Sequence, residues 1–144
     1  MNSLKWAKMI NKIIDTCVII RYITKDHPEH YKIARDFFDL LKFGKERAYL
    51  EQTVLTETVF VLSSKIYQAP RREIADALYD LLIYKGIYNH EKEVLLESLK
   101  IYAKTNLSIV DCIIATKAKY TNLKIQSFDQ ELLKYSNVNI DKDS

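Results

Sequence analysis

In the stretch Lys12-Ile13-Ile14-Asp15-Thr16-Cys17-Val18-Ile19-Ile20-Arg21, one carboxylate lies between two runs that are otherwise almost entirely apolar. Residues 12–14 are rich in β-branched side chains and predict a short buried strand, whereas the run from Val18 to Tyr22 predicts the first turns of a helix. Asp15 would then lie at the carboxyl end of a strand, where open parallel sheets place their ligand sites. Asp15 is therefore the first candidate for a functional residue.

Outside this stretch, short strand patterns alternate with helical patterns. The strands are expected at residues 47–50, 87–89, 123–128 and 138–140, and helices are expected at 28–43 and after residues 53, 71, 91, 108 and 129. Asp26 is a candidate N-cap for the helix at 28–43, and Gly44 occupies the position where a left-handed C-cap is expected. This alternation predicts an α/β domain with a mostly parallel central sheet. We expect a single domain over residues 1–144, with an N-terminal extension at 1–11 and a tail at 141–144.

The composition is that of an ordinary globular protein. The chain has 144 residues, of which 48% are hydrophobic and 28% are charged, with a net charge of +3. No apolar run approaches the ~20 residues of a membrane span, and no signal peptide is recognisable, so we expect a cytoplasmic protein with no membrane partner. The mild positive charge permits a nucleic-acid partner without identifying one. Only two glycines are present, which excludes glycine-rich phosphate-binding loops.

Four carboxylates lie in apolar sequence near a strand end or in the first turns of a helix: Asp15, Glu57, Asp111 and Asp129. Each also has a structural interpretation. Asp15 and Asp129 are in positions suited to N-caps, Ser108 and Asp111 have the spacing of a capping box, and Glu57 has the alternative of facing solvent.

Taken together, the four acids predict a metal site. Helix starts that follow parallel strands gather at one edge of the sheet, and carboxylates within ~4 to 6 Å of one another repel unless a cation neutralises them. Oxygen-only ligands are preferred by hard divalent cations such as Mg²⁺ or Mn²⁺. A cation held in this way can polarise a phosphodiester and lower the pKa of a bound water, which favours metal-dependent hydrolysis.

Other chemistries have no suitable residues. The three histidines, His27, His30 and His90, lie in segments expected to be loops or helix edges, so a two-histidine mechanism is disfavoured. No nucleophile elbow or Ser/His/Asp arrangement is present. The two cysteines, Cys17 and Cys112, match no zinc-site spacing and are interpreted as buried thiols.

Four motifs, in their order along the chain, resemble the PIN domain, and most closely its VapC toxins. They are Asp-Thr-Cys-Val-Ile-Ile-Arg at 15–21, Leu-Thr-Glu-Thr-Val-Phe-Val-Leu at 55–62, Leu-Ser-Ile-Val-Asp-Cys at 107–112 and Ile-Gln-Ser-Phe-Asp at 125–129. The resemblance implies a three-layer α/β/α fold and a metal-dependent endoribonuclease that uses Mg²⁺ or Mn²⁺. It also implies an RNA substrate, a homodimer and inhibition by a small antitoxin protein. The alternative is a PIN-fold module that binds RNA or protein without cutting.

Carried over by position, the family's metal-binding catalytic acids correspond to Asp15, Glu57, Asp111 and Asp129, and its small hydroxyl residues correspond to Thr16 and Ser127, which are expected to support the ligands. The sequence departs from the family at Cys17, where asparagine is usual. RNA binding requires a basic rim, for which the candidates are Arg21, Lys65, Arg71, Arg72, Lys117 and Lys119.

Overall fold

The fold is an α/β arrangement in which seven helices accompany a small parallel sheet, within residues 9–140, the part of the chain that the computed structural model describes. In chain order the elements are β1 (Lys12–Ile13), α2 (Thr16–Thr24), α3 (Pro28–Lys42), β2 (Ala48–Tyr49), α4 (Gln52–Ser63), α5 (Arg71–Leu82), β3 (Ile87–Tyr88), α6 (Lys92–Lys104), α7 (Ile109–Thr121) and α8 (Gln130–Ile140). The predicted α/β class is confirmed. The expected extension and tail fall largely outside the described residues.

The three strands form one parallel sheet in the order β1-β2-β3. Lys12 pairs with Ala48 in the register of β1 and β2, and Ala48 pairs with Ile87 in the register of β2 and β3. The short, parallel strands agree with the sequence prediction. The prediction that residues 12–14 are a buried strand is wrong in one respect, because β1 is an edge strand whose Ile13 side chain is 66% exposed and only Ile14 is buried.

The helices begin and end close to the predicted residues because residues with capping conformations or capping side chains lie at their ends. Gly44 adopts a positive φ of 76°, as expected for the residue that ends α3. Ser108 caps α7 by accepting a hydrogen bond from the backbone N–H of Asp111. The prediction of Asp26 as the cap of α3 is wrong: His27 holds that position, and its Nδ1 accepts from the backbone N–H of His30 at 3.1 Å.

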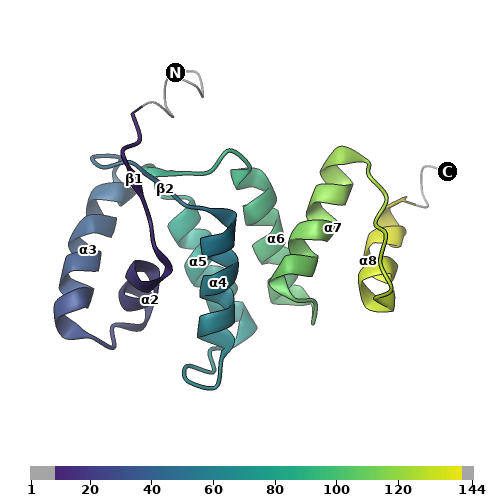
Figure 1. Ribbon diagram of the computed structural model, residues 1–144, viewed down its shortest axis with the longest axis horizontal. Coiled ribbons are helices and arrows are strands. Elements are labelled where there is room, and N and C mark those ends of the chain that lie inside the picture. The colour runs from purple at the N-terminus through teal and green to yellow at the C-terminus, as the bar shows by residue number, and fades with distance from the viewer. Residues whose placement is uncertain (1–8, 141–144) are drawn as a thin grey trace.

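The hydrophobic core draws buried side chains from all seven helices and from the strands. Figure 1 shows the helices lying side by side from α3 at one end to α8 at the other, with the strands crossing above α2 and α4. Helix α5 packs on α6, α6 on α7, and α7 on α8, while α4 contacts α2 and α7. The start of α2, the middle of α4 and the first turn of α7 are therefore held in fixed relation. Within residues 9–140, no helix has the length and apolar character needed to cross a membrane.

Two predicted strands are not formed. Residues 123–128 have no regular structure, and residues 138–140 belong to α8. Apolar residues alternate with polar ones at Leu123 and Ile125, as in a strand, but the segment pairs with no strand of the described sheet. Asp129 therefore follows an irregular segment rather than a strand end.

Candidate functional site

Asp15 lies where the sequence places it, between β1 and α2. It occupies the N-cap position of α2 with extended backbone angles, φ −89° and ψ 154°, yet its side chain makes no capping hydrogen bond. Asp15 therefore occupies the N-cap position, as one interpretation of the sequence predicted, but its carboxylate does not cap the helix. Its oxygens accept no hydrogen bond from the backbone of the helix, which leaves them available to a ligand.

Thr16 is buried beside this carboxylate. Its side-chain Oγ1 has no hydrogen-bond partner within the described residues, although Thr16 is only 6% exposed. A buried hydroxyl without a partner costs free energy, so such atoms call for an explanation. An unsatisfied hydroxyl next to Asp15 fits the supporting role expected for Thr16, which stays a prediction.

Cys17 touches Asp15 directly. The thiol Sγ lies 3.2 Å from Asp15 Oδ2 and donates a hydrogen bond to it. This hydrogen bond, with partial burial and the nearby negative charge, raises the pKa of the Cys17 thiol. Cys17 is exposed, so the interpretation of both cysteines as buried is wrong for this one. It is right for Cys112, whose thiol pKa burial raises to about 11.

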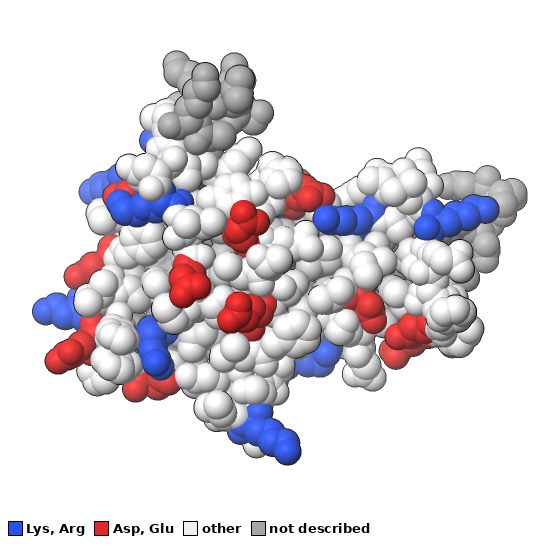
Figure 2. Space-filling model, viewed as in Figure 1, with Lys and Arg blue, Asp and Glu red and all other residues white. Residues whose placement is uncertain are grey.

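Glu57 is exposed in the middle of α4, and the neighbouring Thr58 and Val59 face the core. Its carboxylate makes no hydrogen bond or ion pair within the described residues. Figure 2 shows acidic side chains gathered over α4 and the start of α2, with no basic side chain between them. Glu57 therefore faces solvent, as its structural interpretation allows, on a face that carries local negative charge.

Asp111 lies in the first turn of α7, which packs against α4. Its backbone N–H donates to Ser108 Oγ at 3.1 Å, so the serine half of the predicted capping box is present. The Asp111 carboxylate takes part in no hydrogen bond among the described residues. Like the carboxylate of Glu57, it has no hydrogen-bond partner within residues 9–140, and like that of Asp15 it caps no helix.

Asp129 differs from the other three acids. Its Oδ1 accepts hydrogen bonds from the backbone N–H groups of Glu131 at 3.0 Å and Leu132 at 3.1 Å, so it caps α8. Ser127 Oγ accepts from the backbone N–H of Asp129 at 3.0 Å, which fixes the turn before the helix. The structural interpretation of Asp129 as an N-cap is confirmed, and the hydroxyl of Ser127 serves the turn, while its expected role in supporting the ligands stays a prediction. Only Asp129 Oδ2 is free of these bonds.

The chemistry of the donor set fits a hard divalent cation, since all four side chains offer carboxylate oxygens and a buried hydroxyl is unsatisfied beside Asp15. Across residues 9–140, however, no three His, Cys, Asp or Glu side chains are grouped so as to hold one metal ion. The structure brings the helices that carry Asp15, Glu57 and Asp111 together without closing the acids around one point.

The candidate basic residues divide into two groups. Arg21 pairs with Asp26 at 2.9 Å, Lys117 pairs with Glu91 at 3.4 Å, and Arg71 donates to the backbone carbonyls of Tyr102 and Leu107. The others are exposed and make no ion pair within residues 9–140: Lys65, Arg72 and Lys119. Arg21 and Lys117 are neutralised by carboxylate partners, whereas Lys65, Arg72 and Lys119 meet no carboxylate within residues 9–140 and are better suited to transient phosphate contacts.

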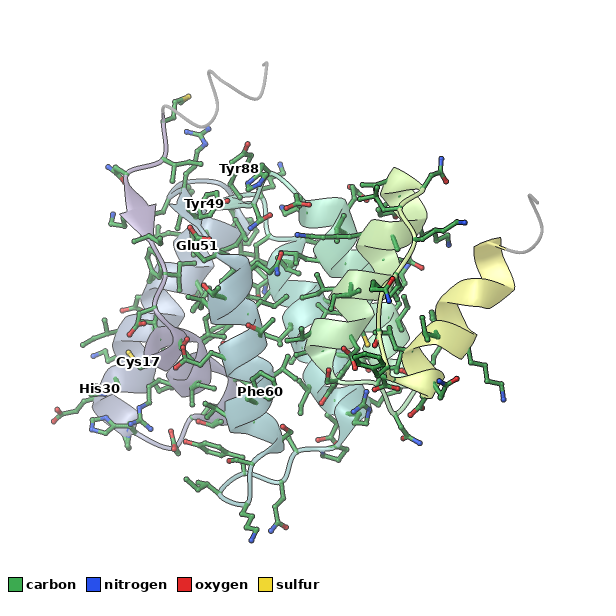
Figure 3. All side chains as sticks on the ribbon, turned by 45° about the vertical axis from the view of Figure 1, so that its right-hand side comes forward. Cys17, His30, Tyr49, Glu51, Phe60 and Tyr88 are labelled. Carbon is green, nitrogen blue, oxygen red and sulfur yellow. The ribbon has the colours of Figure 1, made fainter. Side chains whose placement is uncertain are left out.

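One group of side chains was missed by sequence reasoning. Tyr49 ends β2 and His90 lies two residues after the end of β3, and Tyr49 Oη lies 2.8 Å from His90 Nδ1. The Tyr88 ring lies 5.7 Å from that of Tyr49, and Figure 3 shows these two side chains together above Glu51. The available signal was the polar aromatic residue ending each strand, at the sheet edge where ligands bind.

The chain is similar to known proteins over most of its length. The sequence profile of the PIN domain matches residues 12–138, which includes all four acids. The chain is also similar to a protein named VapC ribonuclease from Aquifex aeolicus (strain VF5), with 26% identity over 125 residues that cover 85% of this chain and 90% of that protein. No solved structure gives a significant match.

Proposed function

The chain belongs to the PIN domain family, and from this membership we propose that it is a metal-dependent endoribonuclease, the toxin of a toxin–antitoxin pair. The observation that carries the proposal is the set of unused carboxylates on packed helices. Asp15, Glu57 and Asp111 make no bond that the helices need, and α4 contacts both α2 and α7. The similarity to a VapC ribonuclease supports RNA as the substrate.

The proposed cofactor is Mg²⁺ or Mn²⁺, held by Asp15, Glu57, Asp111 and Asp129. When bound, the cation would supply a Lewis acid for the phosphodiester and lower the pKa of the attacking water. Glu57 and Asp111 offer both carboxylate oxygens and Asp15 offers Oδ1 and an Oδ2 that accepts only the weak thiol donor of Cys17, whereas Asp129 offers only Oδ2 because two backbone N–H groups bind Oδ1. We therefore expect Asp129 to bind the cation more weakly than the other three acids do.

The protein's own side chains would affect the site in three ways. The acids repel one another and repel RNA phosphates, so the acidic face on its own opposes substrate binding. Cys17 orients Asp15 through the thiol hydrogen bond to Oδ2. Thr16 Oγ1, buried and unsatisfied, is available to donate to a carboxylate oxygen or a water at the site.

The proposed partners follow from the family. A second copy of the chain and a small antitoxin protein are expected to cover apolar surface, and α3 offers such a surface. Its Ile33, Phe37 and Leu40 recur at i, i+4 and i+7, with Ile33 and Leu40 exposed. Exposed apolar stripes of this kind mark protein contacts. We place the protein in the cytoplasm, where its RNA substrates occur.

The test is cleavage of total cellular RNA by the purified protein with Mg²⁺, with excess chelator, and with the Asp15→Asn variant. The account predicts cleavage that chelator and Asp15→Asn both abolish, while a control variant at exposed Asp39, Asp39→Asn, cleaves normally. Asp15→Asn should fold as well as the original protein, or slightly better without metal, because one repelling charge is gone. RNA binding without cleavage under every condition would instead support a non-catalytic PIN module.

A further inference from the structure

A cavity of about 520 Å³ opens between the second half of α4, the start of α5 and the connection from α6 to α7. Its walls are of mixed character. Phe60 and Val59 come from α4, Arg71 from the first residue of α5, and Asn106 and Ser108 from the connection. The cavity is not filled by side chains of the core, and it is not part of the proposed metal site.

The cavity lies one helical turn from two of the candidate acids. Phe60 follows Glu57 by three residues on α4, so the two side chains are neighbours on the helix surface. Ser108 bonds the backbone N–H of Asp111 on the other wall. A ligand in the cavity would therefore lie beside the acidic face, between the helices that carry Glu57 and Asp111.

Arg71 gives the cavity a fixed positive charge. Its Nε donates to the Tyr102 carbonyl at 3.1 Å, a second N–H donates to the Leu107 carbonyl, and the guanidinium carbon lies 3.7 Å from the centre of the Tyr102 ring. These contacts hold the guanidinium in place without neutralising it. Arg71 has no carboxylate partner in the described part of the chain. A preordered, unpaired guanidinium is well suited to an anionic ligand such as phosphate.

Phe60 and Asn106 supply the features of a base-binding site. The Phe60 side chain is 53% exposed, and Figure 3 shows it near the lower end of α4, toward α7. The Asn106 amide is exposed and makes no hydrogen bond within residues 9–140. An accessible ring offers a stacking platform for an unpaired base, and a free amide offers a donor and an acceptor to the base edge.

We propose that this cavity binds one nucleotide of single-stranded RNA, with its base stacked on Phe60 and its phosphate against Arg71. The proposal rests on the proposed function, because it assigns this nucleotide to the strand that the acids cleave. The nucleotide would position the neighbouring phosphodiester over Asp15, Glu57 and Asp111. A duplex would be excluded, since its bases are already stacked and cannot reach the ring.

The first test is equilibrium binding of a short fluorescent single-stranded oligoribonucleotide of mixed sequence, with chelator present so that no cleavage occurs. We expect Phe60→Leu to weaken binding about tenfold, as loss of one base–aromatic stack does. Phe60→Tyr, which keeps the ring, should bind like the original protein. The matched control is Phe43→Leu, at another exposed phenylalanine, which follows α3 and is 67% exposed. Equal affinity of Phe60→Leu and the original protein would overturn the proposal, as would equal losses in Phe60→Leu and Phe43→Leu.

The second test, cleavage with Mg²⁺, separates this proposal from the proposed function. We expect Phe60→Leu to raise KM more than it lowers kcat, because the ring binds substrate without touching the reacting phosphate. If the original protein cleaves RNA and Phe60→Leu does so with unchanged KM, the proposed nucleotide site is refuted and the proposed nuclease function is supported. If RNA binding depends on Phe60 but no RNA is cleaved, the proposed nuclease function is refuted and the proposed nucleotide site is supported. Absence of any binding to single-stranded RNA overturns the site.

Discussion

The thiol of Cys17 donates a hydrogen bond to Asp15 Oδ2 across 3.2 Å, so the least family-like residue of the candidate site touches its first acid. The resemblance of the sequence to the PIN family implies asparagine at this position, and the asparagine amide is also a hydrogen-bond donor. The thiol thus keeps the direction of the bond while weakening it, since S–H is a poorer donor than N–H. This contact ties the departure in sequence to the orientation of Asp15.

Replacement of Cys17 should change the rate of RNA cleavage according to the donor that remains. Cys17→Ala removes the hydrogen bond, and we expect kcat to fall about fivefold, corresponding to ~1 kcal/mol for a modest hydrogen bond. Cys17→Asn supplies an amide donor and should cleave at least as fast as the original protein. Single-turnover cleavage rates measure the difference. Equal rates for Cys17→Ala and Cys17→Asn would show that the donor does not matter.

The reactivity of the Cys17 thiol should report on Asp15. The hydrogen bond to Asp15 and its negative charge raise the thiol pKa, so less of the reactive thiolate is present at neutral pH. Asp15→Asn removes the charge, and alkylation of Cys17 by iodoacetamide should become faster. Buried Cys112 should stay unmodified in the folded protein. Mass spectrometry of the two cysteine peptides follows both reactions, and an unchanged or slower rate at Cys17 would contradict the contact.

Stability should fall in acid through Asp26. Hydrogen bonds from Tyr67, Thr24 and Arg21 lower the pKa of this carboxyl well below its ordinary value of 3.8. A lowered pKa means that the ionised form stabilises the fold above the ordinary pKa, and that this contribution is lost as the pH falls below it. Asp26→Asn should therefore lower Tm at pH 7 and have a smaller effect at pH 3. Asp39→Asn is the control, and an equal loss of Tm at both pH values would refute the assignment.

The two glycines should respond differently to alanine. A Cβ at Gly86 would clash with the carbonyl oxygens of Glu46 and Leu41 where β3 begins, so Gly86→Ala should lower the free energy of unfolding by about 3 kcal/mol. A Cβ at Gly44 meets only Lys85 at 3.4 Å, and its positive φ of 76° costs about 1 kcal/mol. Urea denaturation of both variants measures the difference. A smaller loss at Gly86 than at Gly44 would contradict the packing.

The helices were predictable because their signals are local. Ser108 and Gly44 mark ends that depend on a few neighbouring residues, and the buried stripes of α3 and α5 repeat at helical spacing. Strand pairing is not local. Leu123 and Ile125 alternate with polar residues, as apolar residues do in a strand. This local pattern does not show whether a partner strand is available.

The sequence supplied candidate residues for the site, which stay predictions, but not the geometry of their side chains. The sequence identified four acids, and the structure distinguishes them: the side chain of Asp129 caps a helix, whereas the carboxylate of Asp15 does not cap α2. That distinction depends on side-chain direction. The cavity beside Phe60 was missed because it joins α4 to residues more than forty positions later, through packing that no single segment encodes.

Calorimetric titration with Mn²⁺ shows whether the four acids act as one cation site. We expect saturable binding that Asp15→Asn, Glu57→Gln and Asp111→Asn each abolish, that Asp129→Asn weakens less, and that Asp39→Asn leaves unchanged. Binding that survives all four substitutions at the acids, or RNA cleavage that persists in excess chelator, would contradict the proposed metal-dependent function.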